Sequence, residues 1–415
     1  FAKAPTYNQL DTVNLRDQGI PSDERSTNVL AASGDLVYGA TSGDGCHIFR
    51  FDPKAKTVTV LATIPGPNTV LKGFVLDGDV IYAGTMLTKE QVWWLARKNG
   101  GARELDDAWL YPIDDGWRTG RLYRITGISG PGPKLEDLGV PVKGQGIHTL
   151  AFDPKRRLLY GLTAPAGRFF IYDTASGKTE TITFGTTLSA VSNHMVGSVE
   201  VVKDLTRFTP GEAEFNLKMI SKAMHVMSDG VLYTSGQDGR IIRYDPKVAE
   251  PRKRFTAAGW IPSVPGRQNW NSIDEIVERD GILYMGASDG YIFRFDPRTN
   301  EIGNVGKPVS SVEVMGMAFS PLDGLLYGIN GGADQGVSRF WCLDTSRGTF
   351  EIDYPAVKVF NLKPMADVAV TRGGVIVMAE TERIANLWAL TPGTPKEGEK
   401  SGTIPESDPP DTKVP

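Results

Sequence analysis

The chain has 415 residues, with 45 basic and 49 acidic side chains, which gives a formal net charge of −4. The sequence contains no basic stripe of the kind that binds nucleic acid, and no apolar run approaches the length that spans a membrane. We therefore exclude nucleic acid as a partner and expect no membrane span. The chain begins at Phe1 rather than at Met. We interpret this as the removal of a secretion signal, which predicts an extracytoplasmic protein.

A short sequence pattern recurs seven times along the chain. In its clearest copy, residues 281–297, an apolar run is followed by a Ser-Asp-Gly turn and an alternating run that ends at Asp-Pro. Alternation with period two is typical of a β-strand, and Asp-Gly between two such runs indicates a hairpin. The other copies, of which the second and the last are weaker, cover residues 34–53, 78–126, 157–173, 230–246, 324–344 and 374–391. A repeat with about four strands per unit predicts a radial array.

The N-terminal segment supplies a strand that the last repeat lacks. Residues 12–21 resemble residues 134–141 and 301–308, which follow two of the repeats and read as outer strands. No such segment follows the seventh repeat. We therefore predict an all-β, seven-bladed β-propeller closed by an N-terminal strand, which forms a single domain over residues 1–392. Residues 393–415 are polar and rich in proline, and we predict a tail that does not pack.

Residues 87–119 form an insertion that departs from the regular pattern of the second repeat. The aromatic residues of this insertion could either stack on sugar rings or form a small core of their own.

The chain has two cysteines, in repeats one and six, which are not neighbouring blades, so we expect no disulfide between them. It has no closely spaced cysteine or histidine pairs, so no metal site and no cofactor are predicted.

Basic side chains dominate one predicted mouth of the central channel. In a propeller, the starts of the inner strands and the turns between second and third strands lie around one mouth. These positions hold His47, Lys72, Arg121, His148, Arg168, His225, Arg240, Asn271, Tyr291 and Arg339. Because arginine pairs carboxylates and sulfates bidentately and neutral histidine can move a proton near pH 7, this set predicts an acidic polysaccharide as the partner.

The residue types suit β-elimination at a uronic acid. In that reaction an arginine neutralises the carboxylate, a base removes the adjacent proton, and an acid protonates the leaving oxygen. We assign Arg240 as the neutralising residue and His148 and His225 as the base and acid. The remaining members of the set would bind and orient the sugar.

The seven repeats, with His148 on an inner strand and Arg168 twenty positions later, resemble the seven-bladed propeller polysaccharide lyases, chiefly the ulvan lyase families. In those families two histidines, a tyrosine and an arginine carry the elimination. His148 matches the first histidine and Arg240 matches the arginine. Arg168 stands in place of the second histidine, and Met224 or His225 stands in place of the tyrosine. The resemblance implies a secreted polysaccharide lyase.

Two other functions stay open on the sequence. A glycoside hydrolase could use the same channel, and its product would contain oxygen from water and no double bond. A non-catalytic propeller could instead bind a glycan or a protein. In that case the arginines and histidines of the channel would make only contacts within the protein.

Overall fold

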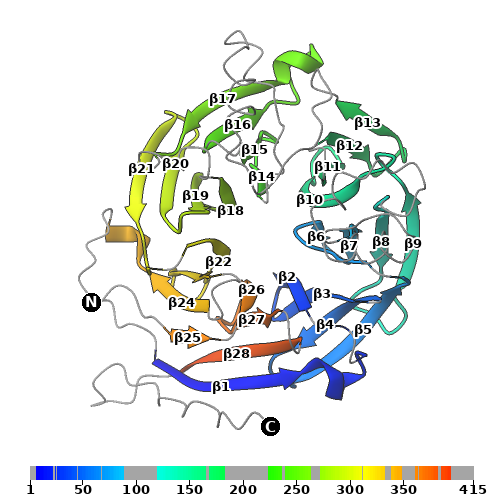
Figure 1. The fold of residues 1–415 in the computed structure, drawn as a ribbon, viewed down its shortest axis with the longest axis vertical. Helices are drawn as coiled ribbons and strands as arrows, with labels where there is room; N and C mark the ends of the chain where they lie inside the picture. Colours follow the sequence, from blue (N-terminus) through cyan, green and yellow to red (C-terminus); the bar gives the residue numbers. More distant parts are fainter. Residues whose placement is uncertain are drawn as a thin grey trace, which may run out of the picture.

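The computed structural model describes residues 6–393, except for residues 22–23, 25, 44, 67, 88–118, 165–167, 183–222, 236–238, 263–271, 311, 332–337, 348–359, 363 and 382–384. Seven antiparallel sheets of four strands each stand around a central axis as the blades of a propeller (Figure 1). The predicted all-β, seven-bladed propeller is therefore confirmed. Among the described residues, no helix is long and apolar enough to cross a membrane.

Blades one to four run in chain order, with the first strand of each next to the axis and the last at the perimeter. Blade one contains β2 (Ser26–Ser33), β3 (Leu36–Ser42), β4 (Cys46–Asp52) and β5 (Thr57–Ile64). Blade two contains β6 (Phe74–Asp77), β7 (Val80–Gly84), β8 (Leu122–Thr126) and β9 (Lys134–Gly139). Blade three contains β10 (Gly146–Asp153), β11 (Leu158–Ala164), β12 (Phe169–Asp173) and β13 (Thr179–Ile182). Blade four contains β14 (Met224–Val226), β15 (Leu232–Ser235), β16 (Arg240–Tyr244) and β17 (Phe255–Trp260).

Blades five to seven complete the ring. Blade five contains β18 (Ile273–Arg279), β19 (Ile282–Ala287), β20 (Ile292–Asp296) and β21 (Glu301–Gly306). Blade six contains β22 (Val314–Phe319), β23 (Leu326–Asn330), β24 (Ser338–Leu343) and β25 (Phe360–Leu362). Blade seven contains β26 (Met365–Val370), β27 (Ile376–Glu380), β28 (Asn386–Gly393) and β1 (Thr6–Asn14).

An N-terminal strand closes the ring, as predicted, but it is Thr6–Asn14 rather than residues 12–21, because Leu15–Gln18 form a 3-10 helix. β1 pairs antiparallel with β28, from Asn14 opposite Asn386 to Thr6 opposite Gly393. The outer strand of blade seven thus comes from the other end of the chain, and pairing it removes an open sheet edge. The proposed boundary between the propeller and a tail at residue 393 stays a prediction, because it falls at the end of the described residues.

The recurring sequence is explained by packing within each blade. The glycine of the second strand lies under an aromatic ring of the third strand, and a β-carbon at Gly161 or Gly328 would collide with Phe170 or Trp341. The aspartate that ends the third strand accepts a hydrogen bond from the backbone two residues later, as Asp296 Oδ1 does from Arg298 N at 2.9 Å. This aspartate therefore forms the turn that leads into the outer strand.

A β-bulge recurs near the start of the inner strands. In five blades the register with the second strand slips by one residue, and the residue after the slip is Val29, Thr149, Glu275, Gly316 or Asp367. A bulge bends its strand and changes the direction of the following side chains. The bulges therefore determine which side chains line the axis.

Candidate functional site

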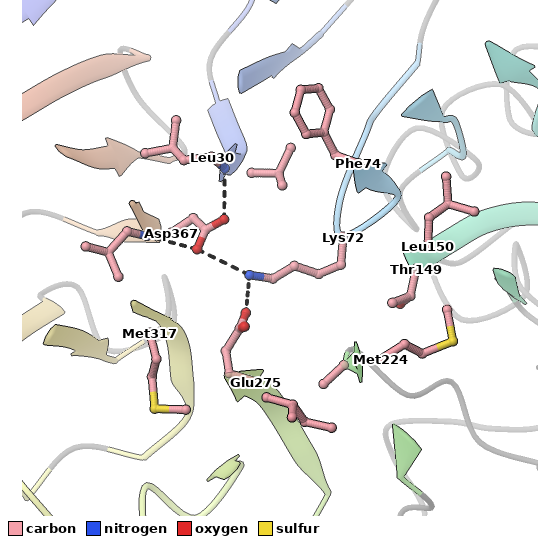
Figure 2. Close-up of a pocket in the computed structure, with 13 residues that line it drawn as sticks. Leu30, Lys72, Phe74, Thr149, Leu150, Met224, Glu275, Met317 and Asp367 are labelled. Atoms are coloured by element: carbon pink, nitrogen blue, oxygen red, sulfur yellow. Dashed lines mark hydrogen bonds and ion pairs between the residues drawn. The ribbon is translucent and has the colours of Figure 1, made fainter. Parts of the chain in front are cut away.

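A cavity of about 170 Å³ lies at the centre of the ring. Its lining comes from all seven blades, and Figure 2 shows that side chains from strands far apart in the sequence point into it. Most of the lining is apolar, including Leu30, Phe74, Met224 and Met317. The charged members of the lining are Lys72, Glu275 and Asp367, which we name the axial triad.

The axial triad joins three blades through one ammonium group. Lys72 Nζ forms ion pairs with Glu275 of β18 and, at 3.5 Å, with Asp367 Oδ1 of β26 (Figure 2). It also donates a hydrogen bond to the Met315 carbonyl at 3.0 Å. The exposed fractions of the three side chains are only 19%, 15% and 8% for Lys72, Glu275 and Asp367. The predicted binding residue Lys72 thus lies at the axis, but carboxylates of the protein itself surround its charge.

The backbone holds Lys72 in this position. Its N–H donates to the His148 carbonyl at 3.1 Å, and its own carbonyl accepts from Leu150 N at 3.1 Å. These two bonds attach the segment before β6 to the inner strand of blade three. Lys72 therefore projects from a fixed point of the channel wall.

Burial and charge shift the pKa values of all three members. Burial lowers the pKa of Lys72, but the neighbouring carboxylates of Asp367 and Glu275 outweigh it and raise the pKa above its ordinary value. Burial raises the pKa of Glu275 to about 7, because Lys72 offsets the loss of water only in part and Asp367 adds repulsion. Burial also raises the pKa of Asp367, against the effect of Lys72 and of two backbone N–H groups. When both carboxyl groups are ionised, the triad therefore holds two negative charges and only one positive charge.

The structure gives different partners to the three residues predicted to be catalytic. His148 Nδ1 contacts Thr149 Oγ1 at 2.8 Å, beside the cavity. His225 Nε2 contacts Glu278 Oε2 of the next blade at 2.8 Å. Arg240 lies over the indole ring of Trp260 on the outer strand of its own blade, 5.6 Å from the ring centre. None of these contacts joins two of the three residues.

The other predicted binding residues are distributed around the ring. In blade one, His47 pairs with the buried carboxylate of Glu24, and in blade two Arg121 Nε pairs with Asp137 Oδ2 at 2.7 Å. In blade six, Arg339 donates to Ser310 Oγ at 3.0 Å.

Two further predicted residues lie in or next to hairpin turns, and one cannot be placed. The backbone of Arg168 bonds to Thr163 across its turn. Tyr291 follows the Ser-Asp-Gly turn of blade five, where Gly290 has a φ of 87°. Asn271 lies outside the described residues, as does most of the aromatic insertion at residues 87–119.

Blades four and five carry cation–aromatic pairs at corresponding positions. Arg240 begins β16 and contacts Trp260, the last residue of β17. Tyr291 directly precedes β20, and Lys307, which directly follows β21, places its ammonium 5.7 Å from the centre of the Tyr291 ring. Trp260 is 51% exposed. We name these four residues the cation–aromatic rim.

The outer strands of blades four and five are in contact at the seam between the blades. A β-carbon at Gly259, next to Trp260, would lie 2.8 Å from Ile302 Cδ1 on β21. Ile302 lies at the start of β21 and Lys307 directly follows its end, so this contact lies away from the second cation–aromatic pair. The two pairs occupy the same end of neighbouring blades, where the third strands begin.

Sequence reasoning missed four residues of these two sites: Glu275, Asp367, Trp260 and Lys307. Glu275 and Asp367 carry a recognisable signal, because each is an acidic residue near the start of an otherwise apolar inner strand. Trp260 ends one outer strand and Lys307 directly follows another, and the repeat pattern singles out neither position. Among the described residues, no group of three or more histidine, cysteine, aspartate or glutamate side chains could hold a metal ion.

Comparisons with known proteins establish the fold alone. No family model matches the chain, and no curated protein matches it. Among solved structures, it resembles the extracellular domain of a protein described as a hybrid two component system, BT4673 from B. thetaiotaomicron, with a TM-score of 0.57 and 12% identity over 94% of this chain. The chain covers 40% of the length of that extracellular domain. It also resembles a chain of the Mitotic Checkpoint Complex, with a TM-score of 0.54, 13% identity and coverage of 94% and 92% of the two chains.

Proposed function

We propose that this chain is a secreted binding propeller that holds an acidic polysaccharide on the cation–aromatic rim of blades four and five. The observation that carries the proposal is the guanidinium of Arg240 over Trp260, whose indole is 51% exposed. An exposed indole offers a flat apolar face to a sugar ring. An arginine beside it supplies the planar fork that pairs with a carboxylate or a sulfate.

The second pair extends the same chemistry to the next blade. Lys307 and Tyr291 place an ammonium and an aromatic ring at the corresponding positions of blade five. Two cation–aromatic pairs on adjacent blades suit a linear polymer in which sugar faces and negative charges recur. The extracellular origin of the similar domain in BT4673 supports a location outside the cytoplasm.

The axial cavity is a poor site for the same ligand. Its volume of about 170 Å³ is smaller than the roughly 300–1,000 Å³ of pockets that bury small molecules. An anion that approached Lys72 would also meet the carboxylates of Glu275 and Asp367. Repulsion by two carboxylates in a buried site disfavours such a ligand.

β-Elimination is the second candidate function, and one observation favours it. Thr149, which lines the axial cavity, contacts Nδ1 of His148 at 2.8 Å and so holds the imidazole in the way that a general base is oriented. It ranks second because His225 and Arg240, its predicted partners, contact Glu278 and Trp260 instead.

Calorimetric titration with ulvan, glycosaminoglycans and pectic fragments tests the proposal, combined with the ultraviolet absorbance of the unsaturated uronyl product. We expect binding to at least one of these glycans that weakens as salt is added, with no rise in absorbance. Absence of binding to all of them would overturn the proposal. A rise in absorbance that His148→Ala abolishes would establish elimination instead, and cleavage without a double bond would establish hydrolysis.

A further inference from the structure

We propose that the axial triad is a proton-linked clasp across the ring, and that Glu275 is the member that takes up the proton. This inference concerns the axis of the propeller and does not depend on the proposed function at the rim.

The triad connects blades that are remote in the sequence. Lys72 precedes the inner strand of blade two, whereas Glu275 and Asp367 belong to blades five and seven. Asp367 Oδ2 also accepts a hydrogen bond from Leu30 N of blade one at 2.8 Å (Figure 2). Together with the hydrogen bond from Lys72 Nζ to the Met315 carbonyl of blade six, the cluster links five blades across the axis.

The two carboxylates have unequal support from hydrogen-bond donors. Asp367 accepts from two backbone N–H groups, Leu30 N at 2.8 Å and Val368 N at 2.9 Å, in addition to its ion pair with Lys72. Glu275 has the ion pair with Lys72. Backbone donors stabilise the ionised form of a carboxylate. These donors favour the ionised form of Asp367, so we assign the proton to Glu275.

The surroundings of Glu275 favour its neutral form. From the elements packed around the cavity it faces the charges of Lys72 and Asp367, and Asp274 on its own strand adds repulsion. Blades four and six contribute the apolar side chains of Met224 and Met317. The imidazole of His148 is bonded to Thr149, and that of His225 is bonded to Glu278. Accordingly, the pKa of Glu275 is raised to about 7.

Protonation of Glu275 leaves Lys72 and Asp367 as a balanced pair. When Glu275 is ionised, the buried cluster contains two negative charges and one positive charge. A carboxyl group whose pKa is higher in the folded state than in the unfolded state stabilises the fold below its unfolded pKa, and this stabilisation is lost as the pH rises through the folded pKa. The contribution of the clasp to stability is therefore greatest under acidic conditions and falls as the pH rises to about 7.

Urea unfolding at several pH values between about 5 and 8.5 tests the clasp with Glu275→Gln and a matched control. For the wild type, we expect the unfolding equilibrium constant to rise with pH by up to about tenfold per pH unit until about pH 7. Glu275→Gln, which has the shape of the protonated side chain, should remove most of this rise. Glu301→Gln makes the same chemical change at an exposed position of blade five and should retain it.

Infrared difference spectroscopy provides a second readout that does not depend on unfolding. Between about pH 6 and about pH 8.5, when surface carboxylates are already ionised, the wild type should lose a carboxylic-acid band that the Glu275→Gln spectrum lacks. An unchanged pH dependence in Glu275→Gln would overturn the proposal. A band that persists in Glu275→Gln and disappears in Asp367→Asn would overturn the assignment of the proton to Glu275.

Discussion

The axis and the rim of this propeller use basic side chains in two different ways. At the axis, Lys72 is enclosed by the inner strands and neutralised by carboxylates from two other blades. At the rim, Arg240 and Lys307 lie on aromatic rings, and the indole of Trp260 is half-exposed. Whether a basic residue can receive an anionic ligand therefore depends on its partner and its exposure, rather than on its position near a channel.

The largest effect is expected at the axis, from Lys72→Met. This change leaves the carboxylates of Glu275 and Asp367 buried without their cation, and breaking a buried ion pair in this way costs about 3–5 kcal/mol. Urea unfolding near neutral pH measures the loss. Lys56→Met is the control, because Lys56 forms an ion pair with Asp11 at the surface, where its side chain is 48% exposed. Such pairs contribute about 0–1 kcal/mol, so equal losses in the two variants would contradict a structural role for the triad.

The next effect is expected at the rim, from Trp260→Ala. Removal of the exposed indole should lower the affinity for an acidic oligosaccharide by about tenfold, which corresponds to about 1.4 kcal/mol. Calorimetric titration measures the affinity, and circular dichroism checks that the fold is kept. Leu322→Ala removes another exposed apolar side chain, in the turn between β22 and β23 at the other end of a blade. The same loss of affinity in both variants would show that the rim is not the binding surface.

A smaller effect is expected from a comparison of Arg240 of the rim with Arg121 of blade two. Arg240→Ala should lower the affinity several-fold and flatten its dependence on salt, because a charge beside the sugar is lost. Arg121 is 47% exposed, and its guanidinium is paired with Asp137. Arg121→Ala should therefore leave the affinity nearly unchanged. If Arg121→Ala weakened binding more than Arg240→Ala, blade two rather than blade four would hold the ligand.

The smallest effect concerns His225, whose prediction as a catalytic residue is weakened by its contact with Glu278. The hydrogen bond from His225 lowers the pKa of Glu278 below its ordinary value. A carboxyl group with a lowered pKa stabilises the fold above its unfolded pKa, and this stabilisation is lost as the pH falls through the lower value. His225→Ala should therefore reduce the loss of thermal stability between neutral pH and about pH 3. The direction is opposite to that at Glu275, and an unchanged acid sensitivity would contradict it.

The sequence predicted the fold well because the repeat is a local pattern. Turn residues and alternation define each hairpin, and the glycine beneath an aromatic ring recurs in several blades. A closing strand at the N-terminus could be predicted because residues 12–21 resemble outer strands elsewhere in the chain, although the strand itself is Thr6–Asn14. The hairpin signals lie within single repeats, and the closing strand follows from a comparison of similar segments, so neither prediction needed knowledge of how the blades meet.

The site was less predictable because its contacts depend on how the blades meet. Lys72 was correctly placed at the axis, but its pairing with Glu275 and Asp367 requires three inner strands to project their side chains to one point. That projection depends on the bulges at Ile273/Glu275 and Met365/Asp367, which have no clear signature in the sequence. Likewise, the contact of His225 with Glu278 crosses the interface between two blades, which the spacing of residues within one repeat does not reveal.

Hydrogen exchange measured by mass spectrometry, with and without a bound acidic oligosaccharide, tests most directly whether the rim rather than the axis receives the ligand. The account predicts slower exchange in β16, β17 and the turn that precedes β20, with no change in β6, β18 and β26. Slower exchange confined to the three inner strands that surround Lys72, with no change at the rim, would contradict it.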